Sequence, residues 1–165
     1  MIADSERGTV VYRFTVRGNP APQGSKSFKG MSKKGHAIMV ESSKAVKPWR
    51  EAVHYAALEA KGFALPLDGA LSVRMVFTMP KPASAPKSRK TWANKTPDLS
   101  KLIRSTEDAL VTSGIIHDDA RITEYNRAAK VFAGEDTEAL DSPGVVITIR
   151  ALGKLGPQFL KLGKE

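Results

Sequence analysis

The sequence predicts an α+β fold, a small mixed β-sheet with two main helices packed on one face, from two observations. Strand-like alternation and helix-like spacing of apolar residues are interleaved along the chain, in the order β, β, α, β, α, β, β. A length of 165 residues suits one domain and is enough to bury a core without a disulfide or structural metal. We therefore expect a single domain over residues 1–151 and a flexible tail over 152–165.

The first quarter of the chain is expected to be β-structure and loop. Residues 9–17 alternate and are rich in β-branched and aromatic side chains, which is typical of a strand. The segment 18–26 contains proline and glycine at positions that exclude a helix or a central strand. The lysine-rich segment that follows, through Gly35, is predicted to be a loop or hairpin tip, and a short strand is expected at 37–41.

The middle of the chain is expected to hold a helix and a strand. The helix has Pro48 in its opening turn and ends at Gly62, a common C-terminal residue. Helical spacing places one set of residues on its inward face, namely Trp49, Ala52, Val53, Ala56 and Ala60. Residues 70–79 alternate strongly enough to predict a second long strand.

The remaining elements follow a proline-rich loop of about sixteen residues, a length that usually indicates a functional or disordered segment. A second helix is expected from about Asp98 to Ser113, stopped by Gly114. Its apolar stripe faces the core and consists of Leu99, Leu102, Ile103, Thr106, Ala109 and Leu110. Two strands, at 122–132 and 144–151, close the domain, with Val145, Ile147 and Ile149 pointing one way.

Composition restricts the class of protein. The chain has no cysteine, which excludes zinc fingers, cysteine nucleophiles and disulfide scaffolds. Asp4 and Glu6 stand where a signal peptide needs an apolar core, and no apolar run reaches membrane-spanning length. We therefore expect a cytoplasmic protein with no membrane segment.

The net charge of +9 is unevenly distributed. Residues 1–97 carry 17 Lys and Arg against 6 Asp and Glu, whereas residues 98–165 carry 9 against 11. This segregation is typical of a protein that holds a polyanion on one surface and performs metal chemistry on another. Basic loops are also ordinary solvated surface, so charge alone does not decide between these interpretations.

Acidic residues suited to a metal ion gather in the segment 96–122. Asp98 lies at the expected start of the second helix, where a carboxylate can cap free N–H groups. Asp118 and Asp119 follow a short apolar run, where a turn would present them. Such acids can hold a hard divalent ion, which in phosphodiester hydrolysis polarises the phosphate and activates water. A helix cap and a polar turn are the alternative interpretations, and spacing alone leaves them open.

Three motifs of this chain, in matching order, resemble the RusA family of Holliday junction resolvases. That family has Asp-x-Asp-Asn opening a helix, a lysine one turn on, Asp-Ala-Leu near its end, and a Gly-Val/Ile-x-x-Asp-Asp turn. The matching positions here are Asp98, Arg104, Asp108, Ala109, Leu110, Asp118 and Asp119. The resemblance extends to the segments 18–26, 41–44 and 47–50, and covers roughly residues 10–150.

The resemblance implies an enzyme of DNA recombination and repair. Members of this family are homodimers whose basic face holds a four-way junction, while aspartates bind Mg²⁺, with Mn²⁺ as an alternative, for symmetric nicking. Two-fold symmetry of the protein would match that of the junction. The expected location becomes the cytoplasm of a bacterial or phage-infected cell.

The match departs from the family at the second acidic position, where this chain has Ser100, followed by Lys101 in place of asparagine. A serine hydroxyl is a weak, neutral ligand, so one negative charge is missing. Glu107 projects about 20° from Ser100 around the helix but lies about 10 Å further along its axis. We hypothesise that Glu107 supplies the missing carboxylate; the alternative is a surface glutamate paired with Arg104. The arginine keeps the charge of the family lysine but does not readily donate a proton.

The predicted site is therefore as follows. The catalytic candidates are Asp98, Arg104, Glu107 and Asp119, and the metal candidates are Asp98, Ser100, Asp118 and Asp119.

A basic loop with one aromatic residue can follow phosphates and stack on an exposed base. The predicted DNA contacts are Lys26, Lys81, Lys87, Arg89, Lys90, Trp92, Lys95 and Lys101. The alternative for the loop is a solvated linker whose tryptophan packs on its own domain. A second basic set consists of Lys26, Lys29, Lys33 and Lys34.

Three functions remain open from the sequence. The leading one is a Mg²⁺-dependent endonuclease that resolves branched DNA. The second is a protein of the same fold that binds junctions without cutting them, because an acid is replaced by Ser100. The third is a basic RNA-binding accessory domain in which the acidic turn is purely structural.

Overall fold

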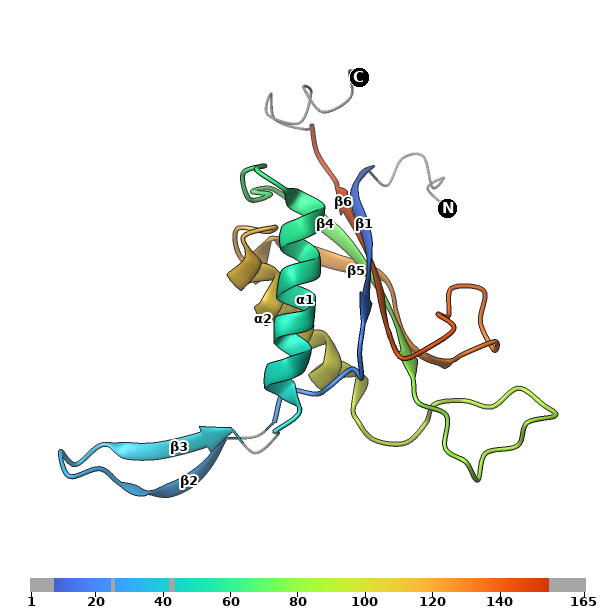
Figure 1. The fold of residues 1–165 in the computed structure, drawn as a ribbon. Helices are drawn as coiled ribbons and strands as arrows, with labels where there is room; N and C mark the ends of the chain where they lie inside the picture. Colours follow the sequence, from blue (N-terminus) through green and yellow to red (C-terminus); the bar gives the residue numbers. More distant parts are fainter. Residues whose placement is uncertain (1–7, 25, 42–43, 155–165) are drawn as a thin grey trace.

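The computed structural model describes residues 8–24, 26–41 and 44–154, and has two layers, with helices on one side of a four-stranded sheet (Figure 1). The strand order is β1 (Thr9–Arg17), β6 (Gly144–Ala151), β4 (Leu71–Met79), β5 (Ile122–Phe132). The β4–β5 pair is parallel, and the other two neighbouring pairs are antiparallel. The predicted mixed sheet with helices on one face is thus confirmed. Most of the expected tail, residues 155–165, lies outside the described ranges.

Two helices, α1 (Val46–Lys61) and α2 (Leu99–Ser113), form the second layer. Both end at the predicted glycines, Gly62 with a φ of 55° and Gly114 with a φ of 75°. Positive φ values cost glycine little, which explains why the chain turns away from the helix at these positions. Neither helix in the described part of the chain is long and apolar enough to cross a membrane.

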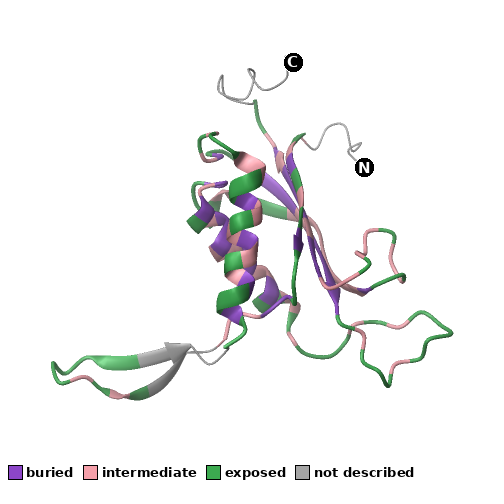
Figure 2. Cartoon of the chain, viewed as in Figure 1, coloured by how far each residue is buried: buried purple, intermediate pink, exposed green. Residues whose placement is uncertain are grey.

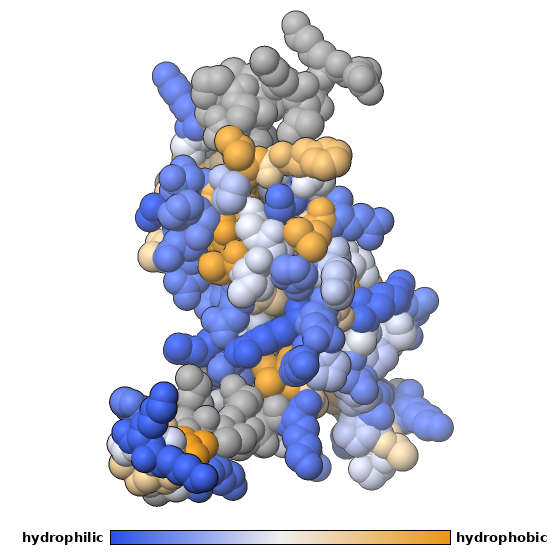
Figure 3. Space-filling model, turned by 60° about the vertical axis from the view of Figure 1, so that its left-hand side comes forward, coloured by the Kyte–Doolittle hydropathy of each residue, from blue (hydrophilic) through white to orange (hydrophobic). Residues whose placement is uncertain are grey.

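One side of α1 is buried and the other is exposed, as the colouring of Figure 2 shows. The predicted inward residues are buried or packed against the core: Trp49, Ala52, Val53, Ala56 and Ala60. On the outside, Tyr55 is 67% exposed, and Phe63 and Leu65 project from the turn after the helix. Apolar groups accordingly interrupt the hydrophilic surface in Figure 3.

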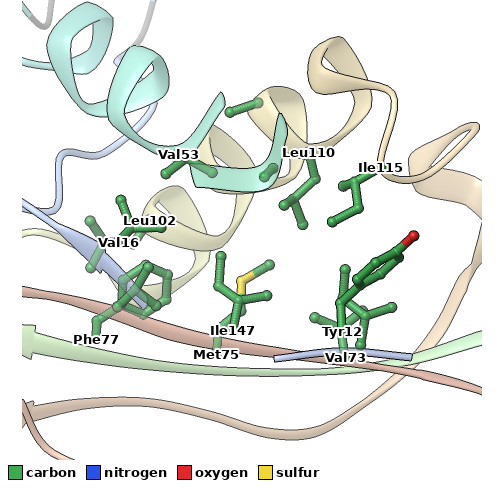
Figure 4. Close-up of a cluster of buried hydrophobic side chains, with 14 of the residues drawn as sticks. Tyr12, Val16, Val53, Val73, Met75, Phe77, Leu102, Leu110, Ile115 and Ile147 are labelled. Atoms are coloured by element: carbon green, nitrogen blue, oxygen red, sulfur yellow. The ribbon is translucent and has the colours of Figure 1, made fainter. Parts of the chain in front are cut away.

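The core lies between the helix layer and the sheet (Figure 4). It is built from side chains of every layer, including Val53 of α1, Leu102 and Leu110 of α2, Met75 and Phe77 of β4, and Ile147 of β6. The predicted inward set of Val145, Ile147 and Ile149 is completely buried. Because full burial of each such side chain contributes about 1.5–3 kcal/mol, this core holds α2 firmly against the sheet.

A separate hairpin projects from the two-layer body (Figure 1). It consists of β2 (Lys26–Met31) and β3 (Ala37–Glu41), which pair in antiparallel fashion. The predicted strand at 37–41 is confirmed, and the tip lies at 32–36. The expectation of a loop was wrong for 26–31, because pairing with β3 gives this segment backbone hydrogen bonds that its own sequence pattern does not signal.

The sheet face away from the helices carries an ion cluster that fastens the segment 133–143. Arg74 Nε lies 2.6 Å from Glu138 Oε1, and Arg127 Nη2 lies 2.6 Å from Asp136 Oδ2. The hydrogen bond from Arg127, together with the backbone N–H of Glu138, lowers the pKa of Asp136 to about 2. Ion pairs therefore attach this segment to β4 and β5.

Candidate active site

A surface hollow of about 560 Å³ lies along the first two turns of α2 and brings together four of the predicted catalytic and metal-binding residues. The α2 side contributes Ser100, Arg104 and Glu107, and the short 3₁₀ helix at Asp119–Arg121 contributes Asp119. Lys101 and the backbone segment Gln23–Gly24 complete the wall. The hollow therefore assembles residues that are far apart in the chain.

Helical spacing explains why three of these residues share one face. Ser100, Arg104 and Glu107 follow one another at intervals of four and three residues, which places them in one row along a helix. Ser100 and Arg104 are exposed, whereas Glu107 is half-buried. The row thus presents a hydroxyl, a cation and a carboxylate to the solvent side of α2.

Glu107 is an acid of the hollow whose pKa is raised by its surroundings. The hydroxyl of Tyr125, on β5, donates a hydrogen bond to Glu107 Oε1. Burial raises the pKa of Glu107, and the negative charges of Asp119 and Asp108 raise it further against the opposing hydrogen bond from Tyr125. No ion pair in the described ranges joins Glu107 to Arg104, so the predicted alternative of a glutamate paired with that arginine is not what the structure shows.

The other two predicted acids stand apart from the hollow. Asp98 occupies the N-cap position of α2, yet its side chain makes no capping hydrogen bond. Its Oδ2 lies 3.6 Å from Lys101 Nζ, at the edge of the hollow. Asp118 Oδ1 accepts a hydrogen bond of 2.8 Å from the backbone N–H of Ala120 and so caps the 3₁₀ turn. Asp118 thus fixes the turn that carries Asp119.

The residues of the hollow fit a hard divalent cation, although in the described part of the chain no three acidic or histidine side chains cluster in a metal-holding arrangement. Mg²⁺ is commonly held by one or two carboxylates, with water as the remaining ligands. Glu107 and Asp119 supply two carboxylates, and Ser100 supplies a neutral oxygen. Burial is the largest cause of the raised pKa of Glu107, and the charge of Asp119 adds to it; a bound cation would offset that repulsion.

Arg50 of α1 belongs to this region and was not singled out as a functional residue from the sequence. Its guanidinium donates to Gln23 Oε1 and, at 2.9 Å, to Asp108 Oδ2. A second hollow beside the first is lined by Arg50, Asp108 and Asp119. Arg50 therefore ties the loop after β1 to both helices. The arginine in the segment 47–50 was the only available signal, and it carried no spacing relation to the acids.

The long loop at 80–97 borders a groove of about 520 Å³ against the ends of β4 and β5. Trp92 stands in the wall of this groove and is 73% exposed, with Lys90 Nζ 4.3 Å from its ring centroid. Lys130 Nζ donates to the carbonyl oxygens of Lys95 and Pro97, at 2.7 Å each. The loop is thus fastened to β5, and its tryptophan is largely exposed to solvent.

The predicted DNA contacts occupy different environments. Lys81 Nζ lies 2.7 Å from Glu135 Oε1 in a largely buried ion pair, so its charge is already compensated. The other predicted DNA contacts with described side chains are exposed, four on the loop and one in the wall of the hollow: Lys87, Arg89, Lys90, Lys95 and Lys101. Lys26 begins β2, and its side chain lies outside the described part.

Two comparisons with known proteins bear on this site. A family model described as endodeoxyribonuclease RusA matches residues 17–150, which include the hollow, the long loop and the hairpin. No curated protein gave a significant match to the chain.

Proposed function

The chain belongs to the endodeoxyribonuclease RusA family, and from this premise we propose that it resolves Holliday junctions by metal-dependent, symmetric nicking of paired strands. The observation that carries the proposal is the hollow, which joins two carboxylates, Glu107 and Asp119, to an exposed cation, Arg104. Hydrolysis of a phosphodiester needs carboxylates that can hold a metal and a positive group that can bind the phosphate.

We propose that Asp119 and Glu107 are the main ligands of Mg²⁺, or of Mn²⁺ in its place. Ser100 would contribute its hydroxyl or hold a water, and Asp98 would join from the edge of the hollow. Asp118 acts through its hydrogen bond to Ala120, by positioning Asp119. When bound, the metal polarises the scissile phosphate and lowers the pKa of an attacking water.

The cationic residues of the hollow have a separate task. Arg104 is exposed next to both acids, so it can bind the non-bridging oxygens of a phosphate and stabilise the charge that develops there. Lys101 stands one turn closer to the start of α2 and can contact the neighbouring phosphate. Glu107 is held in place by Tyr125, which keeps its carboxylate from turning towards Arg104.

The groove beside the long loop supports recognition of a branch point. Its lining is mainly apolar, and Trp92 offers an exposed ring on which an unpaired base can stack. Lys87, Arg89 and Lys95 are exposed on the same loop and can follow the backbone of the strand. A four-way junction offers both unpaired or weakly stacked bases and closely spaced phosphates.

Symmetric nicking requires two sites, and we propose that a second copy of the chain supplies the other one. The outer side of α1 and the following turn expose Tyr55, Phe63 and Leu65, the last 65% exposed. Exposed large apolar side chains, if they form one patch, are typical of an interface, and this helix and turn carry three of them. Light scattering should give twice the chain mass for the natural protein and the single mass for Phe63→Asp with Leu65→Asp; a natural protein of single mass would contradict the dimer.

The decisive experiment is cleavage of a synthetic four-way junction with Mg²⁺ or Mn²⁺, comparing the natural protein with Asp119→Asn. We expect paired, symmetric nicks that disappear in the variant, whereas the matched control Glu59→Gln, an exposed acid on α1, cuts normally. A junction that is bound tightly but left uncut with either metal would support the non-cutting binder. A protein that binds RNA in preference to the junction would support the accessory domain.

A further inference from the structure

The β2–β3 hairpin is a basic arm with no acid near its tip. The sequence contains no Asp or Glu between residues 7 and 40. Lys29, Lys33, Lys34 and His36 are all exposed, and none of them takes part in an ion pair within the described ranges. Figure 2 shows the tip as exposed surface throughout most of its length. Within the described side chains, the positive charge at the tip of the arm is therefore not neutralised by an ion pair.

The tip of the arm is an ordered turn. The backbone N–H of Ser32 donates to the carbonyl of His36 at 2.8 Å, and the N–H of Gly35 donates to the carbonyl of Ser32 at 2.9 Å. Ser32 Oγ also accepts from the N–H of His36 at 3.1 Å. Gly35 has a φ of 79°, which permits the reversal. The turn holds Lys33 and Lys34 at the outermost point of the hairpin.

The root of the arm is fixed at the hollow. Gln23 and Gly24 line the hollow, and the N–H of Gln23 donates to the carbonyl of Lys101 at 2.9 Å. β2 begins two residues after Gly24, so chain connectivity places its first residue within about 8 Å of that glycine. DNA whose phosphate lies in the hollow therefore passes close to the root of the arm.

We propose that the β2–β3 hairpin lies along the duplex arm next to the cut site and holds it through phosphate contacts of Lys29, Lys33 and Lys34. Two-stranded ribbons fit the major groove of duplex DNA. A bare two-stranded hairpin is only marginally stable in water, so a partner that covers it would also stabilise it. This inference rests on the proposed function for its ligand, but it assigns a separate surface and a separate task, recognition of duplex arm length.

The length of the hairpin predicts how many base pairs of duplex it can contact. Strands rise about 3.3 Å per residue, so six residues extend about 20 Å from the hollow. Duplex DNA has one phosphate per strand every 3.4 Å or so, which makes this reach about six base pairs. Junctions whose arms end within about five base pairs of the nick should escape the hairpin, whereas longer arms should engage it.

The test is binding of junctions with arms of about 5 and about 12 base pairs, at several salt concentrations. For the natural protein we expect affinity to rise with arm length. For the triple variant Lys29→Ala, Lys33→Ala, Lys34→Ala we expect that rise to vanish, with a salt slope lower by up to about 2.7 on the longer arms only. The triple Lys→Arg variant should keep the rise, because it keeps the charges. A matched control, Arg13→Ala, Arg150→Ala, Lys154→Ala, removes three cations elsewhere and should also keep it.

The outcomes separate the two proposals. If junctions are bound and cut but arm length affects the natural protein and the alanine triple variant equally, the arm proposal is overturned and the proposed function stands. If the natural protein shows no preference for junctions, both proposals fall together. Circular dichroism of the alanine triple variant should match that of the natural protein, because the three side chains are exposed.

Discussion

Glu107 is the residue on which the proposed chemistry depends most directly, because we propose that it supplies the carboxylate missing at Ser100. The surroundings of Glu107 destabilise its ionised form. Burial and the nearby negative charges raise its pKa, so the folded protein binds this proton more tightly than the unfolded chain does. Ionised Glu107 therefore lowers stability at any pH above its ordinary pKa, which is typical of a residue kept for function.

Replacement of Glu107 with Gln should separate stability from activity. Without divalent metal at pH 8, we expect Glu107→Gln to have a higher thermal midpoint than the natural protein, and the gap should close as the pH falls below the ordinary glutamate pKa. Junction cleavage should fall by about 100-fold or more. Calorimetry across pH and cleavage assays measure the two effects. Unchanged cleavage would remove Glu107 from the site.

A second substitution tests whether Glu107 compensates for Ser100. The two residues share one row of α2, so a carboxylate at either position faces the same hollow. We expect Ser100→Asp, introduced into the Glu107→Gln protein, to recover at least about tenfold of the lost cleavage. Ser100→Asn in the same background has nearly the same size without the charge and should recover nothing. Equal rates for the two double variants would contradict compensation.

At the scale of elements, a buried hydrogen bond fixes the helix pair that carries the site. Trp49 Nε1 donates to Thr106 Oγ1 at 3.2 Å, and both side chains are buried. Thr106→Val keeps the shape but leaves the indole N–H without an acceptor, so we expect a loss of about 1–3 kcal/mol in the free energy of unfolding. Urea denaturation measures this loss. In a Trp49→Phe background the same substitution should cost much less, and an equal cost in both backgrounds would argue against the bond.

Ion pairs attach the segment 133–143 to the sheet, and this predicts that the stability of the protein depends on pH. Because the folded state lowers the pKa of Asp136 to about 2, the ion pair with Arg127 contributes stability above pH 4 and loses it as the pH falls towards 2. We expect Asp136→Asn to be less stable than the natural protein at pH 7 and nearly equal at pH 2. Denaturation at both pH values checks this, and a gap independent of pH would contradict it.

The helices and strands could largely be predicted from the sequence, whereas the side-chain contacts between them could not. Gly62 and Gly114 end the helices as expected, because a helix needs a residue tolerant of positive φ there. The 3.6-residue period also placed Ser100 and Glu107 on one face. Arg50 and Tyr125 were missed, because their partners Asp108 and Glu107 come from other elements. Only the packing of α1 on α2 and of α2 on β5 brings those pairs together.

At the scale of the whole molecule, the fold pairs much of the acidic half of the chain with basic residues and leaves other cations free. Glu135, Asp136, Glu138 and Asp141 all lie in ion pairs with Lys or Arg. The lysines of the hairpin tip and most cations of the long loop take part in no ion pair within the described ranges. The excess of positive charge is therefore concentrated where DNA is proposed to bind.

This distribution predicts how salt affects binding. Removing the four exposed cations of the long loop, Lys87, Arg89, Lys90 and Lys95, should lower the slope of log affinity against log salt by up to about 3.6. Trp92→Ala should instead weaken junction binding by about 1–3 kcal/mol without changing that slope, since stacking releases no counterions. Fluorescence titrations at several salt concentrations distinguish the two effects. An unchanged slope in the four-cation variant would argue against phosphate contacts by this loop.

The position of β6 has a consequence for how the protein is made. This strand is the last one in the described part of the chain, yet it lies between β1 and β4, and without it β1 has no neighbour in the sheet. A growing polypeptide therefore cannot close its sheet until residues 144–151 have left the ribosome. The proposed cutting site depends on that closed sheet for support, so a nascent or prematurely terminated chain carries the acids of the site without the framework to use them. The proposed cutting activity therefore requires that residues 144–151 have been translated and paired.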